Sequence, residues 1–394
     1  MKIAEVRLRE VQGTLPFDGE FWEDRLVRPL DMYPRFRALG PEFLPRVEGG
    51  YRIKAHFVEI ATDEGVVGIG GPIPVEQAFL IYHDIRPVLE GADALATEVM
   101  WDTMYRAAVH GRKGTPMMAI SAVDCALWDL KGRYFNAPVY RLLGGPSRTE
   151  IPAYASMLGY SIEPDRAAAR AREAVQNGFR AMKWFFRHGP ADGKDGMVKN
   201  AQMVSAVRGA VGDQVDVMLD CWMSWDVPYT VAMAERLEDY EPRWLKEPVM
   251  PDKIESYAAI RRQISIPVSG GEHEYTRWGL KQLMDAEAVD VLQPDIYWAG
   301  GISEMLKICA LASTYDLPVI PHGHSTPASA HLIASQPPNV CPLLEYLIKW
   351  NEIHQHFLKT PLKPSGGVVR LPEAPGIGMD LDEGKIEQQR LLTF

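Results

Sequence analysis

The stretch that decides the fold runs from residue 215 to residue 272 and holds three segments: VDVMLDCW (215–222), RWLKEP (243–248) and PVSGGE (267–272). Each is a short apolar run that reaches one acidic residue: Asp220, Glu247 or Glu272. The acids are about 25 residues apart, which leaves room for a loop, a helix and a second loop between parallel strands. The spacing therefore predicts β/α repeats that bring three carboxylates to one edge of a parallel sheet.

Three carboxylates at one sheet edge repel one another unless a cation lies among them. Hard divalent ions such as Mg²⁺ prefer oxygen ligands and leave positions open for water or substrate. We therefore predict that Asp220, Glu247 and Glu272 bind Mg²⁺. A single acid of this kind could instead cap the following helix or pair with a surface lysine, but that alternative is much weaker for three acids together.

The composition is that of an ordinary soluble protein and argues against some partners. The chain has 394 residues, 46% of them hydrophobic and 24% charged, and a net charge of −10, which disfavours nucleic acid and acidic membranes. In its first residues, MKIAEVRLREV, polar and apolar residues alternate as in a strand, without the apolar region of a signal peptide. Its four cysteines form no CxxC pair. We expect a cytoplasmic protein with reduced thiols that assembles as a homo-oligomer.

The first part of the chain, residues 1–140, predicts an α+β capping domain. It combines a strand over residues 2–11, a hairpin over residues 51–71 and a helical stretch over residues 75–137. The hairpin turn is expected at Asp63-Glu64-Gly65. Between the strands, residues 13–50 lack periodicity, which is typical of a loop that covers a substrate.

The second part, residues 141–363, alternates short apolar strands with helical patterns. This rhythm predicts an α/β fold of the (β/α)₈ type, either a regular TIM barrel or the modified (β/α)₇β variant with one helix lost. The last part, residues 364–394, lacks the rhythm and is expected to return to the capping domain. The candidate barrel strands are 151–157, 180–186, 215–222, 243–247, 267–272, 289–295, 317–322 and 341–346.

Ionisable residues gather at the ends of these strands, where the reacting groups of such barrels lie. The middles of the same strands carry almost none, and burying charge without function is costly. The strand-end residues are Lys183, Asp220, Glu247, Glu272, Asp295, His322 and Glu345.

Neighbouring strand ends carry Asp295 and His322, and a carboxylate beside an imidazole makes a general base for a carbon acid. We expect His273 to donate a proton or hydrogen bond to substrate, and Lys183 to stabilise developing negative charge. Glu345 is expected to bond a hydroxyl or an enolate oxygen. The alternatives are a structural His322, a solvent-exposed His273 and a surface Lys183.

Together these groups predict α-proton abstraction from a hydroxy acid chelated by a divalent metal. The enediolate that results is either reprotonated, giving a racemase or epimerase, or loses its β-hydroxyl, giving a dehydratase. A metal-dependent binding scaffold without turnover is the alternative outside enzymes. A scaffold has no need of a paired Asp and His.

The chain resembles the enolase superfamily in its mandelate racemase branch, and within that branch the L-rhamnonate dehydratases. The resemblance covers most of the chain and rests on these motifs: SAVDCALWDLKGR, LLGG, KNAQMV, MLDCWMSWDV, SGGEHEY, QPDIYWAGG and PHGHS. It implies that Asp220, Glu247 and Glu272 bind Mg²⁺ and that His322 with Asp295 forms the base pair. It further implies that His322 takes the C2 proton of an acid sugar, with a 2-keto-3-deoxy acid as product.

The chain departs from this resemblance in two places. Racemases of the branch carry Lys-x-Lys on the second barrel strand, but here the sequence is Lys183-Trp184-Phe185, which favours dehydration over racemisation. In the loop, a substrate-contacting His before a Trp is expected, whereas this chain has Phe21-Trp22. The sugar could therefore be L-rhamnonate or a related aldonate such as lyxonate, fuconate, mannonate or gluconate. The loop candidates for its recognition are Trp22, Tyr33, Arg46 and Arg52.

Overall fold

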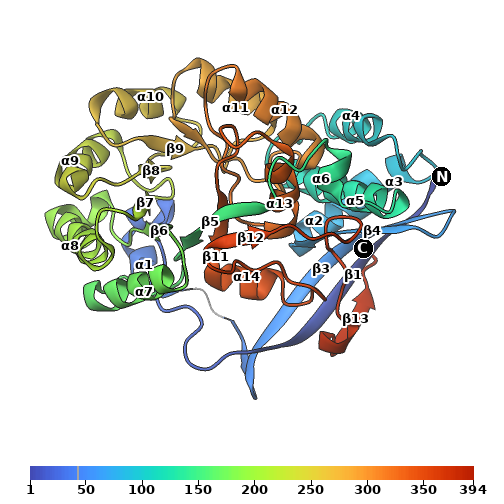
Figure 1. Ribbon diagram of the computed structural model, residues 1–394, viewed down its shortest axis with the longest axis horizontal. Coiled ribbons are helices and arrows are strands. Elements are labelled where there is room, and N and C mark those ends of the chain that lie inside the picture. The colour runs from blue at the N-terminus through green and yellow to red at the C-terminus, as the bar shows by residue number, and fades with distance from the viewer. Residues whose placement is uncertain (42–43) are drawn as a thin grey trace.

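A parallel sheet curls into a barrel at the centre of the computed structural model, which describes residues 1–41 and 44–394 (Figure 1). Its strands lie in the order β10-β9-β8-β7-β6-β5-β11. Their bounds are β5 (Glu150–Ser156), β6 (Ala181–Phe185), β7 (Asp216–Asp220), β8 (Trp244–Lys246), β9 (Val268–Gly270), β10 (Val291–Leu292) and β11 (Leu344–Leu347). The predicted barrel fold is confirmed.

The barrel closes between β10 and β11 through backbone pairing of Val319. This residue forms an isolated bridge to Leu292, and its N–H donates to Val340 O at 2.7 Å. The strand expected over residues 317–322 is therefore wrong in extent. Pro318 and Pro321 flank the bridge and lack the N–H groups that a longer ladder needs.

Helices surround the barrel on its outside (Figure 1). The first of them buries the small residues Ala167, Ala171 and Ala174 and packs against the helix that follows it in the chain. The helices are α7 (Pro164–Gln176), α8 (Gly193–Val211), α9 (Val227–Leu237), α10 (Ile254–Gln263), α11 (Thr276–Asp285), α12 (Gly301–Ser313), α13 (Thr326–Ser335) and α14 (Ile348–His354).

A layer of apolar side chains fills the inside of the barrel below its carboxyl ends. Successive strand residues alternate between faces, so the residue two positions further along a strand points to the same interior. For four members of the layer, that residue is Lys183, Asp220, Lys246 or His322. The strand period thus sets a polar layer above an apolar one. The apolar layer consists of Tyr154, Ala181, Met218, Trp244, Val291 and Ile320.

The N-terminal part forms a second sheet, which is antiparallel. Its order is β13-β1-β3-β2, and β4 pairs with β3. The turn between β3 and β4 covers Asp63-Glu64-Gly65, as the sequence predicts. Because β13 pairs with β1, the C-terminal residues lie on this sheet. The strands are β1 (Ile3–Pro16), β2 (Arg46–Val47), β3 (Gly50–Thr62), β4 (Val67–Ile73) and β13 (Gln388–Leu391).

The helix α5 (Thr115–Tyr134) joins this sheet to the barrel. It packs against β4 and α12, and its residues from Met117 to Leu130 are almost all buried. Trp128 Nε1 donates to Ser303 Oγ at 2.8 Å, and Asp124 accepts from the backbone and the hydroxyl of the same serine. The neighbouring helices are α2 (Val75–Leu80), α3 (Arg86–Leu89), α4 (Thr97–Ala107) and α6 (Val139–Leu142).

Residues 17–41 and 44–45 form an irregular segment that crosses to the barrel mouth and includes the short helix α1 (Pro34–Arg37). Residues 42 and 43 of the expected covering loop lie outside the described residues. A further strand, β12 (Val368–Arg370), pairs antiparallel with β5. All four cysteines are free and buried. Among the described helices, none has the length and apolar character to span a membrane.

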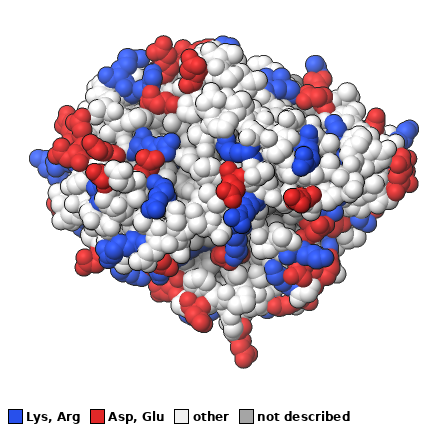
Figure 2. Space-filling view, in the orientation of Figure 1, with Lys and Arg blue, Asp and Glu red and all other residues white. Residues whose placement is uncertain are grey.

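The surface carries charges of both signs. Acidic and basic side chains are interspersed over the face drawn in Figure 2. Exposed ion pairs of the described residues include Lys281 with Asp285 and Lys363 with Glu352. Such pairs contribute little to stability, because solvent screens them.

Glu10 ties the C-terminal strand to the capping sheet. Its buried carboxylate accepts hydrogen bonds from Arg390 Nε at 3.0 Å and Nη2 at 3.1 Å. The Arg390 hydrogen bonds, more than any other contact, lower the pKa of Glu10 from 4.5 to about 2. A carboxyl group with a lower pKa in the folded state stabilises the fold above its unfolded pKa and loses this contribution as the pH falls through the folded value.

We expect Glu10→Gln to remove this pH-dependent contribution. Between pH 4.5 and pH 2, the urea midpoint of the wild type should fall more steeply than that of the variant. Glu5→Gln is the control, because Glu5 is an exposed acid on the same strand. Parallel pH dependence of wild type and Glu10→Gln would contradict the assignment.

Candidate active site

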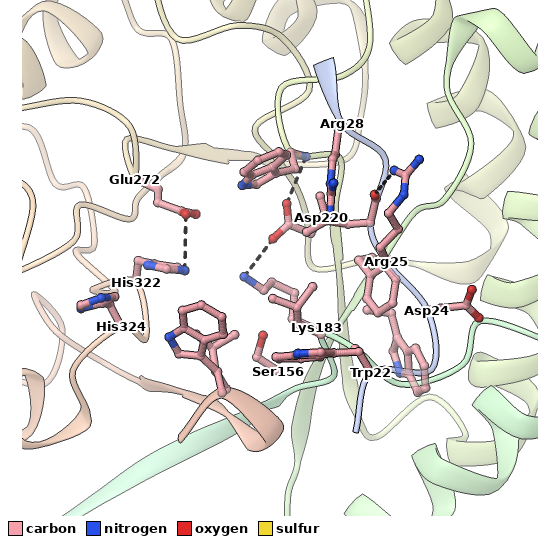
Figure 3. A pocket seen from close by; sticks show the side chains of 18 of the residues that line it. Trp22, Asp24, Arg25, Arg28, Ser156, Lys183, Asp220, Glu272, His322 and His324 are labelled. Carbon is pink, nitrogen blue, oxygen red and sulfur yellow. Dashed lines mark hydrogen bonds and ion pairs between the residues drawn. The ribbon is translucent and has the colours of Figure 1, made fainter. Parts of the chain in front are cut away.

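A cavity of about 230 Å³ lies at the carboxyl ends of the barrel strands (Figure 3). Barrel residues form one wall: Ser156, Lys183, Asp220, Trp222, Glu272, Trp298, His322 and His324. The irregular N-terminal segment forms the opposite wall with Trp22, Asp24, Arg25, Leu26 and Arg28. The cavity is therefore built by two parts of the chain that are far apart in sequence.

His322 and Asp295 form a buried pair at this mouth. His322 Nδ1 lies 2.7 Å from Asp295 Oδ2, and the N–H of Tyr297 holds the other carboxylate oxygen at 2.7 Å. His322 Nε2 is left facing the cavity wall, 3.4 Å from Glu272 Oε1. Burial lowers the pKa of His322, but the charge of Glu272 and the hydrogen bond to Asp295 outweigh burial and raise it above 6.5. An imidazole with a raised pKa that a carboxylate orients beside a cavity suits proton transfer.

Lys183 reaches into the same cavity from β6. Its Nζ lies 2.6 Å from Glu345 Oε1 and 3.0 Å from Asp220 Oδ2. Burial lowers the pKa of Lys183, but the charges of Glu345 and Asp220 outweigh burial and raise it. In Figure 3, the nitrogen ends of Lys183 and His322 face one another across the cavity. An ammonium and an imidazole thus lie on opposite sides of one space.

Lys246 is a residue that the sequence reasoning missed. It is fully buried at the end of β8, and its Nζ lies 3.2 Å from Asp220 Oδ2 and 3.4 Å from Glu247 Oε2, and closer still to Glu272 Oε2. Burial lowers its pKa, but the surrounding carboxylates outweigh burial and raise it well above 10.5. The three predicted metal ligands therefore surround a lysine ammonium. Strand alternation could have predicted it, because Lys246 lies two residues after Trp244 and so points to the same interior face of the barrel.

The donor set fits a hard divalent ion. Asp220, Glu247 and Glu272 are buried carboxylates that already converge on one cation, the ammonium of Lys246. Ligand atoms of Glu247, Glu272 and His273 also lie within 4.8 Å of one another. Oxygen-rich groups of this kind suit Mg²⁺. The residues that would hold the ion are thus those that the strand spacing predicts.

His273 lies one layer behind the cavity wall. Its Nδ1 is 2.9 Å from Glu247 Oε2, and its ring packs edge-on against Trp222 with centroids 5.9 Å apart. Burial lowers its pKa, but the charges of Glu247 and Glu272 outweigh burial and raise it to about 9. His273 is not among the side chains that line the cavity, and its expected contact with substrate stays a prediction.

Of the four loop residues predicted to recognise the sugar, the structure places one, Trp22, in the lining of the cavity. Tyr33 is 53% exposed and borders a different surface hollow. Arg46 packs over the ring of Tyr51, and Arg52 Nη1 pairs with Glu387 at 2.6 Å. Strand pairing directs Arg46 and Arg52 along the capping sheet and away from the barrel mouth.

Arg25 is the loop residue that the sequence reasoning overlooked. Its guanidinium is buried and bidentate on Asp31, with contacts of 2.8 and 2.9 Å, and it also donates to the carbonyl oxygens of Leu26, Phe36 and Leu39. A guanidinium group that donates hydrogen bonds to one carboxylate and several backbone carbonyl groups fixes the path of a segment without regular structure. Arg25 therefore shapes the wall of the cavity.

This barrel, with a carboxylate cluster and a His–Asp pair at its carboxyl ends, defines a class of barrel enzymes that act on carbon acids. Two family models match the chain: the Mandelate racemase / muconate lactonizing enzyme, N-terminal domain, over residues 52–144, and the Enolase C-terminal domain-like model over residues 166–385. The chain belongs to the enolase superfamily, in its mandelate racemase branch.

Several relatives are similar over nearly the whole chain. An L-rhamnonate dehydratase of Saccharopolyspora erythraea is 35% identical over 398 residues, covering 97% of each chain. The structure of a rhamnonate dehydratase from Gibberella zeae complexed with Mg is 30% identical, covers 98% of this chain and 95% of that one, and has a TM-score of 0.83. The structure of a racemase from Streptomyces coelicolor A3(2) with bound magnesium is 27% identical, covers 98% of both chains and has a TM-score of 0.80.

Proposed function

We propose that this protein is a Mg²⁺-dependent hydro-lyase that dehydrates an aldonic acid, L-rhamnonate or a close analogue, to a 2-keto-3-deoxy acid. The observation that carries the proposal is the His322–Asp295 pair, 2.7 Å apart, in which His322 lines a cavity bordered by carboxylates and Lys183. The similarity to rhamnonate dehydratases supports the reaction type and the substrate class.

The proposed reaction begins at the C2–H bond. His322 Nε2 takes the C2 proton, and the electron pair moves into the substrate carboxylate as an enediolate. Lys183 stabilises this developing negative charge with its ammonium. Asp220, Glu247 and Glu272 would hold Mg²⁺, which would supply further positive charge for the same anion. Asp295 keeps the His322 ring oriented, because its carboxylate holds Nδ1.

The second half of the reaction removes water. The protonated His322 returns its proton to the C3 hydroxyl as the C3–O bond breaks, when hydrogen and hydroxyl lie on one face of the substrate. The resulting enol takes a proton from solvent at C3, loses the proton of its C2 hydroxyl to solvent and becomes the keto acid. Glu345 positions Lys183 through their 2.6 Å contact, and His273 positions Glu247 through a 2.9 Å contact.

The test is a panel of aldonic acids: L-rhamnonate, lyxonate, fuconate, mannonate and gluconate. Each is incubated with the full-length protein and Mg²⁺, and the 2-keto acid is trapped with semicarbazide. We expect a semicarbazone signal with at least one acid. No signal with any of them would count heavily against the proposal.

Racemisation is the second candidate, favoured by the similarity to the magnesium-binding racemase. It requires an acceptor for the proton on each face of the substrate. Opposite His322, however, Lys183 is held in two ion pairs, and Phe185 stands where the branch carries its second lysine. A racemase would exchange and invert the C2 hydrogen in deuterated water without forming a keto acid.

We also propose that residues 1–140 act as a cap, with loop 13–50 covering the mouth of the barrel, residues 141–363, and residues 364–394 returning to the cap. The cavity wall formed by Trp22, Asp24 and Arg25 supports this division. Trp22 packs against Trp350 of the barrel with ring centroids 6.1 Å apart. The loop is thus in a position to read the distal groups of a sugar.

A further inference from the structure

Lys246 lies at the height of Asp220 in the barrel. The two residues are direct partners in the parallel ladder between β7 and β8. Lys246 also follows Trp244 of the apolar layer by two positions, so its side chain points to the inside of the barrel. Strand geometry alone therefore places the ammonium in the polar layer, at the centre of the carboxylates.

The side chain of Glu247 reaches the same barrel mouth because of its backbone conformation. Consecutive residues of a regular strand point to opposite faces, so Glu247 should point outward. Its backbone instead adopts φ +47°, a left-handed conformation that is uncommon for a residue with a side chain. This turn brings the Glu247 carboxylate beside Lys246, 3.4 Å from its Nζ. Two neighbouring residues of opposite charge thus share one site.

The contacts of Lys246 match those of a shared cation. Its Nζ lies 3.2 Å from Asp220 Oδ2 and 3.4 Å from Glu247 Oε2, with Glu272 Oε2 nearer than either. A divalent ion bound to all three carboxylates needs oxygen atoms at about 2.1 Å, so it would take the space where the ammonium lies. Two positive charges in that space would repel each other strongly.

We propose that Lys246 is a built-in competitor of Mg²⁺, whose ammonium must leave the centre of the three carboxylates before the ion can bind there. Lys246 thereby sets the metal affinity of the site. The inference rests on the metal site of the proposed function, but not on the identity of the sugar or on turnover.

The test compares Mn²⁺ binding by the wild type and Lys246→Gln, measured as loss of the free-ion signal in electron paramagnetic resonance. We expect the variant to bind Mn²⁺ at least about tenfold more tightly, because it keeps the three carboxylates and loses the competing charge. The control is Lys349→Gln: Lys349 is another buried lysine, paired with Glu23 at 2.9 Å, and its loss should leave the Mn²⁺ affinity unchanged.

Equal or weaker Mn²⁺ binding by Lys246→Gln would overturn the inference, because a lysine that only holds the carboxylates in place would weaken the site when removed. Circular dichroism checks the fold of each variant. If Lys246→Gln does not fold, wild-type crystals soaked in millimolar Mn²⁺ decide. An ion with the ammonium moved aside supports competition; an ion beside an unmoved ammonium overturns it, and a site that stays empty removes the metal site on which the inference rests. None of these measurements needs a substrate.

Discussion

Replacing His322 by Asn is expected to lower kcat by about 10³-fold or more, because proton transfer by a positioned side chain contributes up to about 10⁴-fold. The structure leaves His322 Nε2 as the imidazole nitrogen that faces the cavity, with Nδ1 held by Asp295 at 2.7 Å. Asn fills part of the same space but cannot take a proton. The measurement is the rate of 2-keto acid formation from the best acid of the panel.

Two checks separate a chemical effect from a structural one. His322→Asn should keep the circular dichroism of the wild type and should still bind Mn²⁺, because its carboxylates remain. His331→Asn serves as the matched control: His331 is a buried histidine of α13 that accepts the N–H of Tyr140, remote from the cavity lining. If both variants lost activity equally, or if His322→Asn kept wild-type turnover, the general-base role would be wrong.

Replacing Asp129 by Ala is expected to lower the free energy of unfolding by about 3–5 kcal/mol, the usual cost of removing one partner of a buried ion pair. The carboxylate accepts from Ile69 N at 3.0 Å, from Ile377 N at 2.8 Å and from Arg133 Nε at 2.7 Å. It thereby joins α5, the capping sheet and the C-terminal segment. Alanine leaves all three donors without this partner.

The matched control for this prediction is Asp380→Ala. Asp380 pairs with the same Arg133 at 2.8 Å but is 57% exposed, so its loss should cost less than about 1 kcal/mol. Denaturant unfolding followed by circular dichroism measures both variants. Similar losses for the two aspartates would mean that the burial of Asp129 does not matter, and would contradict the prediction.

The barrel could be predicted because its signal is repeated. Each strand is a short apolar run, and each run is followed by a helical pattern before the next, so small errors at one strand do not change the architecture. The extent of single strands was harder to predict. Over residues 317–322, Pro318 and Pro321 reduce an expected strand to the one bridge at Val319, because neither proline can donate to a ladder.

The strand-end rule brought together the residues that the structure also brings together, including His322 with Asp295 and Asp220 with Glu272 around one mouth. The sequence reasoning missed Lys246 because the direction of its side chain depends on its register within the strand. The role of strand-end ligand was given to its neighbour, Glu247. Both side chains point into the barrel mouth because Glu247 has a φ of +47°. No short sequence motif predicts this backbone conformation.

The loop could not be predicted in the same way. A segment without periodicity gives no rule for which side chains face the barrel, so Tyr33, Arg46 and Arg52 were chosen by residue type alone. The path of the segment depends on the buried contact of Arg25 with Asp31 and on backbone carbonyl groups, which are tertiary interactions. Trp22 could be predicted because it stands where the L-rhamnonate dehydratases that this chain resembles are expected to carry a Trp, although Phe21 replaces the His expected before it.

The most direct test of the proposed dehydration is proton nuclear magnetic resonance of the reaction in deuterated water, with Mg²⁺ and each acid of the panel. We predict that one acid loses water and yields a 2-keto-3-deoxy acid with solvent deuterium at C3, and that His322→Asn does not form it. Acids that all remain unchanged, or that gain deuterium at C2 without forming a keto acid, would contradict this prediction.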